Sequence, residues 1–300
     1  MKNFAGKVAF ITGGCSGIGY ALAEAFGRRG MKVMIADIDE KNLSAAVERL
    51  RAAQISAEGV RCDVADRTSV QAAALAVIAK FGKIHLVCNN AGVTVGTGWP
   101  LGTTTERDWN WVIDVNLKGV INGVEVFAPL LESHGEGGHI VNTASMAALA
   151  AIPTREPYHA TKAAVLMASE GWRAQLESRG IGVSVLMPGA VSTQLFESAT
   201  RRPERYGTRN YDTQKEQRYV SAISSGMSPG MVAARVVEAV ESNELYVFTH
   251  HEFRQSVEAR FKAILAAFDT AAKSPALEDH KPSDVGALTG ALKGDVPKGR

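Results

Sequence analysis

The sequence has few cysteines and almost no excess of either charge. Its cysteines, Cys15, Cys62 and Cys88, are odd in number and lack Cys-x-x-Cys spacing, which favours unpaired thiols in a reducing compartment. The 33 basic and 31 acidic residues leave a net charge of +2, which gives no support to a nucleic-acid footprint. We therefore expect no disulfide framework and no nucleic-acid partner.

Long apolar runs and convincing metal-ligand patterns are also missing. No apolar run approaches the ~18 residues that a membrane span needs. A strand pattern starts at Lys7, which leaves no room for a signal peptide. His250-His251-Glu252 resembles a ligand cluster only superficially, because adjacent histidines on a strand point to opposite faces. These absences predict a cytoplasmic protein without a metal site or a membrane partner.

What the sequence does contain is an alternation of apolar strands and periodic helices. Of its 300 residues 46% are hydrophobic and 21% are charged, which is typical of a globular protein with a large core. Alternation of this kind indicates βαβ units, and hence an α/β fold with a doubly wound parallel sheet covered by helices on both faces. The expected strands cover residues 7–12, 32–36, 56–62, 84–89, 139–143, 182–187 and 245–249. The expected helices cover residues 20–29, 40–53, 68–81, 105–131, 158–178, 228–242 and 253–272.

A glycine-rich turn links the first strand to the first helix, and this context gives the glycines their meaning. Gly13 permits a tight turn, Gly17 lets a pyrophosphate approach the backbone, and Gly19 lets helix and strand pack closely. Free N–H groups at the start of the helix can then receive the phosphate charge. A merely flexible loop is the alternative, and the flanking elements speak against it. The predicted phosphate-binding residues are Gly13, Cys15, Ser16, Gly17, Ile18 and Gly19.

Asp37 ends the second strand, eighteen residues after Gly19. Its carboxylate can accept hydrogen bonds from the ribose hydroxyls of a dinucleotide and would repel a 2′-phosphate. The glycine turn has no arginine or lysine, and Ile38 follows Asp37, so we expect NAD rather than NADP. Asn89 and Asn90 could tie neighbouring strands or accept cofactor contacts. Further cofactor contacts are expected where later strands end: Asp63, Val64, Asn90, Ala91 and Gly92.

Tyr158 and Lys162 lie four residues apart in a helical pattern and so project from the same face, one turn apart. A phenol with a reference pKa near ~10 is a poor base at neutral pH, and a neighbouring ammonium lowers that pKa. The pair can therefore take a hydroxyl proton while a carbon-bound hydride leaves. Ser145 stands thirteen residues upstream of Tyr158. The alternative for this pair alone is a core tyrosine beside a solvated lysine.

The chain after the sixth strand departs from the alternation. Residues 194–227 have the length of a substrate lid, with an apolar and aromatic supply that includes Phe196 and Tyr206. These aromatics favour a bulky apolar ligand, or else they only pin the lid to the core. The arginines in this segment favour a solvated face over an anion site; they are Arg201, Arg202, Arg205 and Arg209. From residue 273 onwards the composition predicts a loosely held tail, which leaves residues 1–272 as the catalytic domain.

Together these motifs resemble the short-chain dehydrogenases/reductases in order and spacing over roughly residues 5 to 250. The resemblance implies a single-domain Rossmann-type fold with a seven-stranded sheet, and a homodimer or homotetramer. It rests on six motifs: Thr12-Gly13-(x)3-Gly17-Ile18-Gly19, Asn89-Asn90-Ala91-Gly92, Asn116, Ser145, Tyr158-(x)3-Lys162 and Pro188-Gly189.

The same resemblance implies a role for each catalytic residue. Ser145 would hold the carbinol oxygen, and Tyr158 would be the acid/base. Lys162 would bind the nicotinamide ribose and depress the pKa of Tyr158, and Asn116 would support a water that relays protons to Lys162. Asn116 also interrupts an apolar helical pattern, which favours a kink or a buried polar role. The expected nicotinamide-side contacts are Pro188, Gly189, Val191 and Thr193.

The function that follows is NAD-dependent hydride transfer between a secondary alcohol and the nicotinamide, giving the ketone. The lid and C-terminal region also resemble the longer bacterial members that oxidise aryl carbinols, the Cα-dehydrogenases, through Arg202-Pro203-(x)2-Tyr206-Gly207-Thr208. One alternative is an NADPH-dependent ketone or 3-oxoacyl reductase, against which Asp37 speaks. Another is a non-catalytic NAD-binding regulator on the same fold, against which the intact catalytic residues speak.

Overall fold

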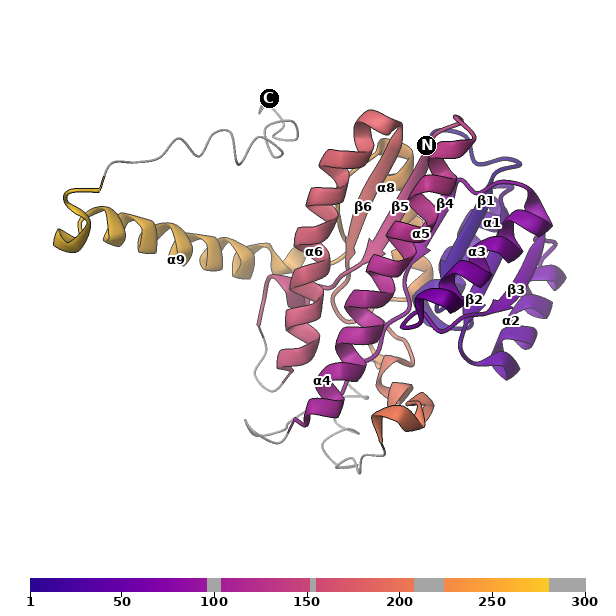
Figure 1. The fold of residues 1–300 in the computed structure, drawn as a ribbon, viewed down its shortest axis with the longest axis horizontal. Helices are drawn as coiled ribbons and strands as arrows, with labels where there is room; N and C mark the ends of the chain where they lie inside the picture. Colours follow the sequence, from indigo (N-terminus) through magenta and orange to yellow (C-terminus); the bar gives the residue numbers. More distant parts are fainter. Residues whose placement is uncertain (96–103, 152–154, 208–223, 281–300) are drawn as a thin grey trace. The chain divides into compact units, whose positions relative to one another are not determined.

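The computed structural model describes residues 1–95, 104–151, 155–207 and 224–280 (Figure 1). The chain forms two compact units, Met1–Thr249 and His250–Arg300. The first unit carries the sheet and every residue predicted for the site. A catalytic domain that extends to residue 272 stays a prediction, because compactness does not tell whether residues 250–272 contribute to catalysis.

The first unit is built on one parallel sheet of seven strands in the order β3-β2-β1-β4-β5-β6-β7. The chain moves outward from β1 to β3 and then returns to pair β4 with β1, so the strand order reverses between β1 and β4. In such sheets ligands bind at the carboxyl ends of the strands beside the reversal. The strands are β1 (Val8–Thr12), β2 (Lys32–Asp37), β3 (Ala57–Arg61), β4 (Leu86–Asn89), β5 (Gly138–Thr143), β6 (Ile181–Met187) and β7 (Tyr246–Phe248).

Helices cover both faces of this sheet, as the alternation predicted (Figure 1). Helix α1 packs against α8 on one face, with α2 beside them. On the other face α3 packs against α5, and α4 against α6. The α-helices are α1 (Gly17–Arg28), α2 (Glu40–Ala52), α3 (Arg67–Phe81), α4 (Glu106–Ile113), α5 (Gly119–Ser133), α6 (Glu156–Leu176) and α8 (Pro229–Ser242). The short helical turns are η1 (Asp114–Lys118), η2 (Met146–Ala148), η3 (Glu177–Arg179), η4 (Leu195–Arg201) and η5 (Glu204–Tyr206).

The core lies on both sides of β1, whose five residues are all buried. Successive side chains of a strand point to opposite faces. Ile11 accordingly joins the cluster under α1 and α8, while the ring of Phe10 lies 4.5 Å from the ring of Phe127 in α5. Burial of one such side chain stabilises the fold by about 1.5–3 kcal/mol. The strand end that leads into the glycine turn is therefore anchored from both faces.

The helix expected over residues 105–131 is in fact three segments. Thr105 caps α4 and exchanges a capping box with Asp108. The chain then winds into a π-helix, η1, before α5 begins at Gly119. Asn116 lies inside η1 with no exposed surface, as the predicted buried polar role requires. The chain is thus helical from Glu106 to Ser133, as predicted, and periodicity did not register the single extra residue of the π-turn.

The second unit, described up to residue 280, consists mainly of α9 (Arg254–Ala272), with η6 (His251–Phe253) before it and η7 (Pro275–Leu277) after it. Phe261, Leu265 and Phe268 of α9 are exposed. In the described part of the chain, no helix combines the length and the apolar composition that crossing a membrane requires.

Candidate active site

The glycine turn leaves the start of α1 open for an anion. Gly13 and Gly17 have φ values of 65° and 53°, a region that side-chain-bearing residues rarely adopt. At Gly19 an added Cβ would lie 2.1 Å from the Gly13 carbonyl oxygen, so helix and turn are in contact there. Ser16, the N-cap, makes no side-chain capping bond, whereas side chains cap α2, α3, α4 and α8. The first N–H groups of α1 therefore suit a pyrophosphate.

Asp37 stands at the end of β2 with its carboxylate fixed beside this turn. Its Oδ2 accepts the Cys15 N–H at 3.3 Å, and its Oδ1 accepts the Asp39 N–H at 3.2 Å. Burial, reinforced by the Asp37 charge, raises the pKa of the Cys15 thiol, so Cys15 stays protonated and is no nucleophile. Arg49 was not foreseen from the sequence: it donates to the Cys15 carbonyl at 3.4 Å and covers the Tyr20 ring.

The carboxyl ends of β3 and β4 bring the other predicted cofactor residues to the same edge. Asp63 accepts the Ala65 N–H through Oδ1 and pairs through Oδ2 with Arg205 at 2.7 Å. Val64 is buried against Gly119. The Asp63–Arg205 ion pair joins residues 142 positions apart, and no signal in the sequence pointed to it.

Asn89 and Asn90 tie neighbouring strands, which was one of the two roles considered for them. Asn89 Nδ2 donates to Asn142 Oδ1 on β5 at 2.9 Å. Asn90 Nδ2 donates to the Thr12 carbonyl on β1 at 3.0 Å. The backbone N–H groups of Asn90 and Ala91 donate to Thr12 Oγ1 at 2.9 and 3.0 Å. These bonds hold the ends of β1 and β4 together at the reversal; a cofactor contact of Asn90 stays a prediction.

Tyr158 and Lys162 lie one turn apart on α6, as predicted, with the Lys162 Nζ 5.5 Å from the Tyr158 ring centroid. Lys162 is buried, and its Nζ donates to the Thr143 carbonyl at 2.7 Å. Burial lowers the pKa of Lys162 to about 8. The ammonium thus remains charged at neutral pH and is poised to interact with the half-buried Tyr158.

Asn116 and Lys162 meet beside Gly92. A Cβ on Gly92 would lie 3.4 Å from Asn116 Oδ1 and 3.7 Å from Lys162 Nζ, so both polar groups line the space beside this glycine. Asn116 is held on both sides by the Val93 backbone: Oδ1 accepts its N–H at 2.8 Å, and Nδ2 donates to its carbonyl at 2.9 Å. The weaker contact with Thr161 Oγ1, at 3.5 Å, links Asn116 to α6.

Ser145 follows β5 and faces the loop after β6. Its hydroxyl donates to the Pro188 carbonyl at 3.3 Å and accepts the Ala147 N–H at 3.1 Å. The long bond to Pro188 leaves the hydroxyl proton available to a better acceptor. Gly189 follows Pro188; Val191 then bridges to Met227, and Thr193 lies against Gly17 of the glycine turn. The predicted nicotinamide-side and phosphate-side residues therefore share one edge of the sheet.

The segment after Thr193 corrects the expectation for Arg202 and decides between the two roles left open for Tyr206. Arg202 is not on a solvated face: its side chain is only 5% exposed and pairs with the buried Asp108 at 2.6 Å. Tyr206 is buried in a cluster with Trp111, so this aromatic pins the segment to the core and does not face a ligand. Phe196 lies under the Arg155 guanidinium, at 5.4 Å. Trp99, Arg209, Tyr211 and Tyr219 fall outside the described residues.

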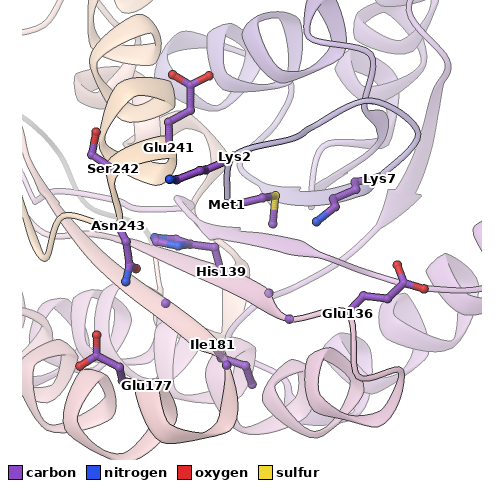
Figure 2. Close-up of a pocket in the computed structure, with 14 residues that line it drawn as sticks. Met1, Lys2, Lys7, Glu136, His139, Glu177, Ile181, Glu241, Ser242 and Asn243 are labelled. Carbon is purple, nitrogen blue, oxygen red and sulfur yellow. The ribbon is translucent and has the colours of Figure 1, made fainter.

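A hollow opens where β5 and β6 begin, away from the predicted site (Figure 2). Its volume is about 660 Å³, and charges of both signs line it, among them Lys2, Lys7, Glu136 and Glu177. The Met1 ammonium, also on its wall, donates to the Val240 carbonyl at 2.8 Å. None of the predicted catalytic residues reaches this hollow, and we assign it no ligand.

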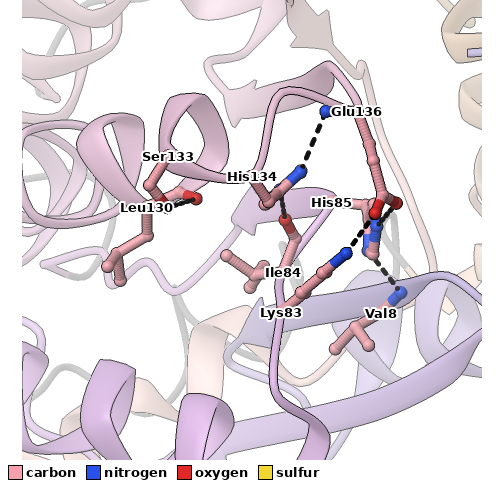
Figure 3. Close-up of polar contacts among 8 residues, drawn as sticks. All are labelled: Val8, Lys83, Ile84, His85, Leu130, Ser133, His134 and Glu136. Atoms are coloured by element: carbon pink, nitrogen blue, oxygen red, sulfur yellow. Dashed lines mark hydrogen bonds and ion pairs between the residues drawn. The ribbon is translucent and has the colours of Figure 1, made fainter.

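His85, His134 and Glu136 form the one group, among the residues described, whose spacing would suit a metal ion (Figure 3). The Nδ1 atoms of both rings already accept backbone N–H groups, from Val8 to His85 and from Glu136 to His134. The ring protons must then sit on Nε2, which leaves neither imidazole a free lone pair. Lys83 further neutralises Glu136. This chemistry does not fit a metal site.

Comparison with known proteins identifies the family. The sequence matches the short chain dehydrogenase family over residues 7–204. The chain belongs to this family. A relative from Sphingobium sp., a C alpha-dehydrogenase, is 38% identical over 88% of this chain and 87% of its own length. A Lactiplantibacillus plantarum relative, a CLA biosynthesis dehydrogenase/reductase, is 32% identical over 88% of this chain and 95% of its own.

Solved structures of other short-chain dehydrogenases agree with the fold. A short chain dehydrogenase/reductase from Burkholderia phymatum in complex with NAD superposes with a TM-score of 0.84. It is 39% identical and covers 89% of this chain and 97% of its own. The chain is therefore an oxidoreductase of the short-chain family, with the seven-stranded Rossmann-type sheet that its motifs predicted.

Proposed function

We propose that this short-chain dehydrogenase uses NAD to oxidise a secondary alcohol that bears a bulky, aryl or otherwise hydrophobic group, and gives the ketone. The observation that carries the proposal is the position of Tyr158 and Lys162 one turn apart on α6, with Asn116 beside Lys162 at Gly92 and Ser145 at the start of η2, which packs against α6. NAD, when bound there, supplies the hydride acceptor. The chain's own residues handle the proton.

Each of these side chains has its own role in the proposed proton transfer. Tyr158 takes the hydroxyl proton of the alcohol, and the buried Lys162 ammonium stabilises the phenolate that forms. Ser145 turns its hydroxyl from the Pro188 carbonyl toward the substrate oxygen. Asn116, beside Lys162 at Gly92, supports the exit of the proton toward solvent. General acid–base catalysis of this kind contributes about 10²–10⁴-fold.

The proposed preference for NAD rests on the fixed carboxylate of Asp37. Two backbone N–H groups, of Cys15 and Asp39, prevent it from turning away from the ribose position. A 2′-phosphate there would meet a fixed negative charge. Arg49, a basic residue that contacts the glycine turn, is occupied by the Cys15 carbonyl and the Tyr20 ring.

The substrate proposal rests on one relative and on one aromatic side chain. The Sphingobium relative is a C alpha-dehydrogenase, and Phe196 supplies one aromatic side chain after β6. Since Tyr206 is committed to the core, Phe196 carries more of the argument than the sequence suggested. We further expect a homodimer or homotetramer and a cytoplasmic location. The exposed small residues Ala160, Ala163 and Gly171 on the outer face of α6 leave room for a partner helix.

The test is a matrix of initial rates with purified protein. NAD and NADP are each paired with an aryl-substituted secondary alcohol and with a sugar alcohol. The highest kcat/KM is expected for NAD with the aryl alcohol. Tyr158→Phe should lower kcat by about two to four orders of magnitude and leave NAD affinity intact.

Tyr246→Phe is the matched control, because this exposed tyrosine also loses only a hydroxyl, one that donates to Glu170 at 3.0 Å. Best turnover of the sugar alcohol would overturn the substrate class. Retention of more than about a tenth of the activity by Tyr158→Phe would point to another base.

A further inference from the structure

The short segment Arg202–Gly207 is docked firmly on α4. Arg202 Nη1 donates to Asp108 Oδ1 at 2.6 Å, and the two side chains are 5% and 0% exposed. The same guanidinium donates through Nη2 to the Tyr206 carbonyl at 2.6 Å and lies 5.0 Å over the Trp111 ring. A buried ion pair that also makes these contacts fixes the backbone at Tyr206.

Tyr206 reaches from this segment to the π-helix. Its ring is 6% exposed and packs with Val95, Trp111 and Val112. Its hydroxyl donates to Asp114 Oδ2 at 2.8 Å, while the other oxygen of Asp114 pairs with Lys118 at 2.7 Å. Asp114 and Lys118 are the first and last residues of η1, so one carboxylate links both ends of the π-turn to Tyr206.

The π-helix η1 carries Asn116, whose proposed role requires a fixed position. A π-turn inside an α-helix is rare and is found frequently at functional sites. Asn116 lies at the centre of η1, and its side chain is gripped by the Val93 backbone. Val93 in turn packs against the cluster that contains Tyr206. Tyr206 thus supports Asn116 from two directions, through Asp114 on its own helix and through the packing beneath Val93.

We propose that Tyr206 and Asp114 are positioning residues, which hold the π-helix so that Asn116 faces Lys162. The inference rests on the proposed function, because it assigns these residues a role in the proton relay described there. Neither residue touches the reacting atoms. The competing interpretation is that Tyr206 only buries apolar surface, a role that phenylalanine would fill equally well.

The experiment compares Tyr206→Phe with the matched variant Tyr246→Phe, since each replaces a tyrosine whose hydroxyl donates to a carboxylate. Hydrogen exchange is followed in peptides that cover residues 114–118, and kcat, KM and NAD affinity are measured beside it. Loss of a hydrogen bond to a charged group should raise exchange in η1 and lower kcat, each by about tenfold. KM and NAD affinity should stay within about twofold, because the ring and its packing remain.

A second variant, Asp114→Ala, tests whether Tyr206 and Asp114 act through the same hydrogen bond. Asp114→Ala should lower kcat at least as much, and Tyr206→Phe should cost less in that variant than in the wild type, because both changes break the Tyr206–Asp114 bond. The pH profile of kcat should shift in the same direction in both variants if the proton path through Asn116 is altered.

If hydrogen exchange in η1 were as slow in Tyr206→Phe as in the wild type, the inference would be overturned. Faster exchange with unchanged kcat would also overturn it, because it would show a purely structural bond. Additive effects in the double variant would also contradict it. The exchange measurement needs no turnover, so it gives its answer even if the unmodified protein fails to oxidise any alcohol, the result that would refute the proposed function instead.

Discussion

Replacing Lys162 by methionine should change how stability depends on pH, in addition to abolishing the predicted catalysis. Lys162 is 3% exposed, and burial lowers its pKa from 10.5 to about 8. In the unfolded chain the ammonium is hydrated and regains its ordinary proton affinity. Burial of the Lys162 ammonium, the charge that the proposed catalysis uses, therefore lowers the stability of the folded state. Methionine fills a similar volume without that charge.

The sign and size of the effect follow from these two pKa values. Between pH 8 and pH 10.5 the unfolded chain binds one more proton than the folded chain, so the free energy of unfolding rises with pH. The penalty is complete below pH 8 and disappears toward pH 10.5. At 1.36 kcal/mol for each tenfold change in proton affinity, it amounts to about 3 kcal/mol. The Thr143 carbonyl, 2.7 Å from Nζ, loses its donor in the variant, which costs about 1–3 kcal/mol.

Urea unfolding of the cofactor-free protein measures this balance. Near neutral pH Lys162→Met should be as stable as the wild type or more stable, by up to about 2 kcal/mol. The advantage of the variant should then fall by about 3 kcal/mol as the pH is raised through the interval between the two pKa values. Lys41→Met, at an exposed position of α2, is the control and should follow the wild type. Parallel curves for Lys162→Met and the wild type would refute the claim that a charged lysine is buried here.

Two further predictions concern Asp37 and Arg202. Asp37→Ala combined with Ile38→Arg should narrow or invert the preference for NAD, because it removes the fixed carboxylate and adds a phosphate partner; equal kcat/KM for NAD and NADP in the unmodified protein would contradict this. Arg202→Met should destabilise the region around α4 by about 3–5 kcal/mol, since it strands the fully buried Asp108 charge. Limited proteolysis should then cut near residues 202–207 much faster than in the wild type, and unchanged cleavage would show that the ion pair contributes nothing.

The sheet and its edge could be predicted because their signals are local. The buried strands are short apolar runs, and the glycine turn stands between a strand and a helix, so position in the chain already implied position in space. The same holds for Tyr158 and Lys162, whose spacing on one helix brings them together. The buried polar role of Asn116 could also be predicted, because asparagine is unfavourable inside an apolar helical pattern.

The parts that could not be predicted depend on pairs far apart in the chain. The contact between Tyr206 and Asp114 spans 92 residues, and that between Arg202 and Asp108 spans 94. No periodicity links such positions, so an arginine-rich segment gave the ordinary expectation of a solvated face. For Tyr206 the sequence left two roles open, a ligand contact or a pin to the core, because its residue type indicates burial and only the fold decides which surface buries it.

The central claim is that this site moves a hydride from a secondary alcohol to NAD while Tyr158 takes the proton. Its most direct test uses an aryl-substituted secondary alcohol labelled with deuterium at the carbinol carbon. We expect the label to appear in the reduced nicotinamide of the wild type and of Tyr246→Phe, and we expect Tyr158→Phe to transfer it more slowly by about two to four orders of magnitude. Reduced cofactor without the label, or equal transfer rates in the two tyrosine variants, would contradict it.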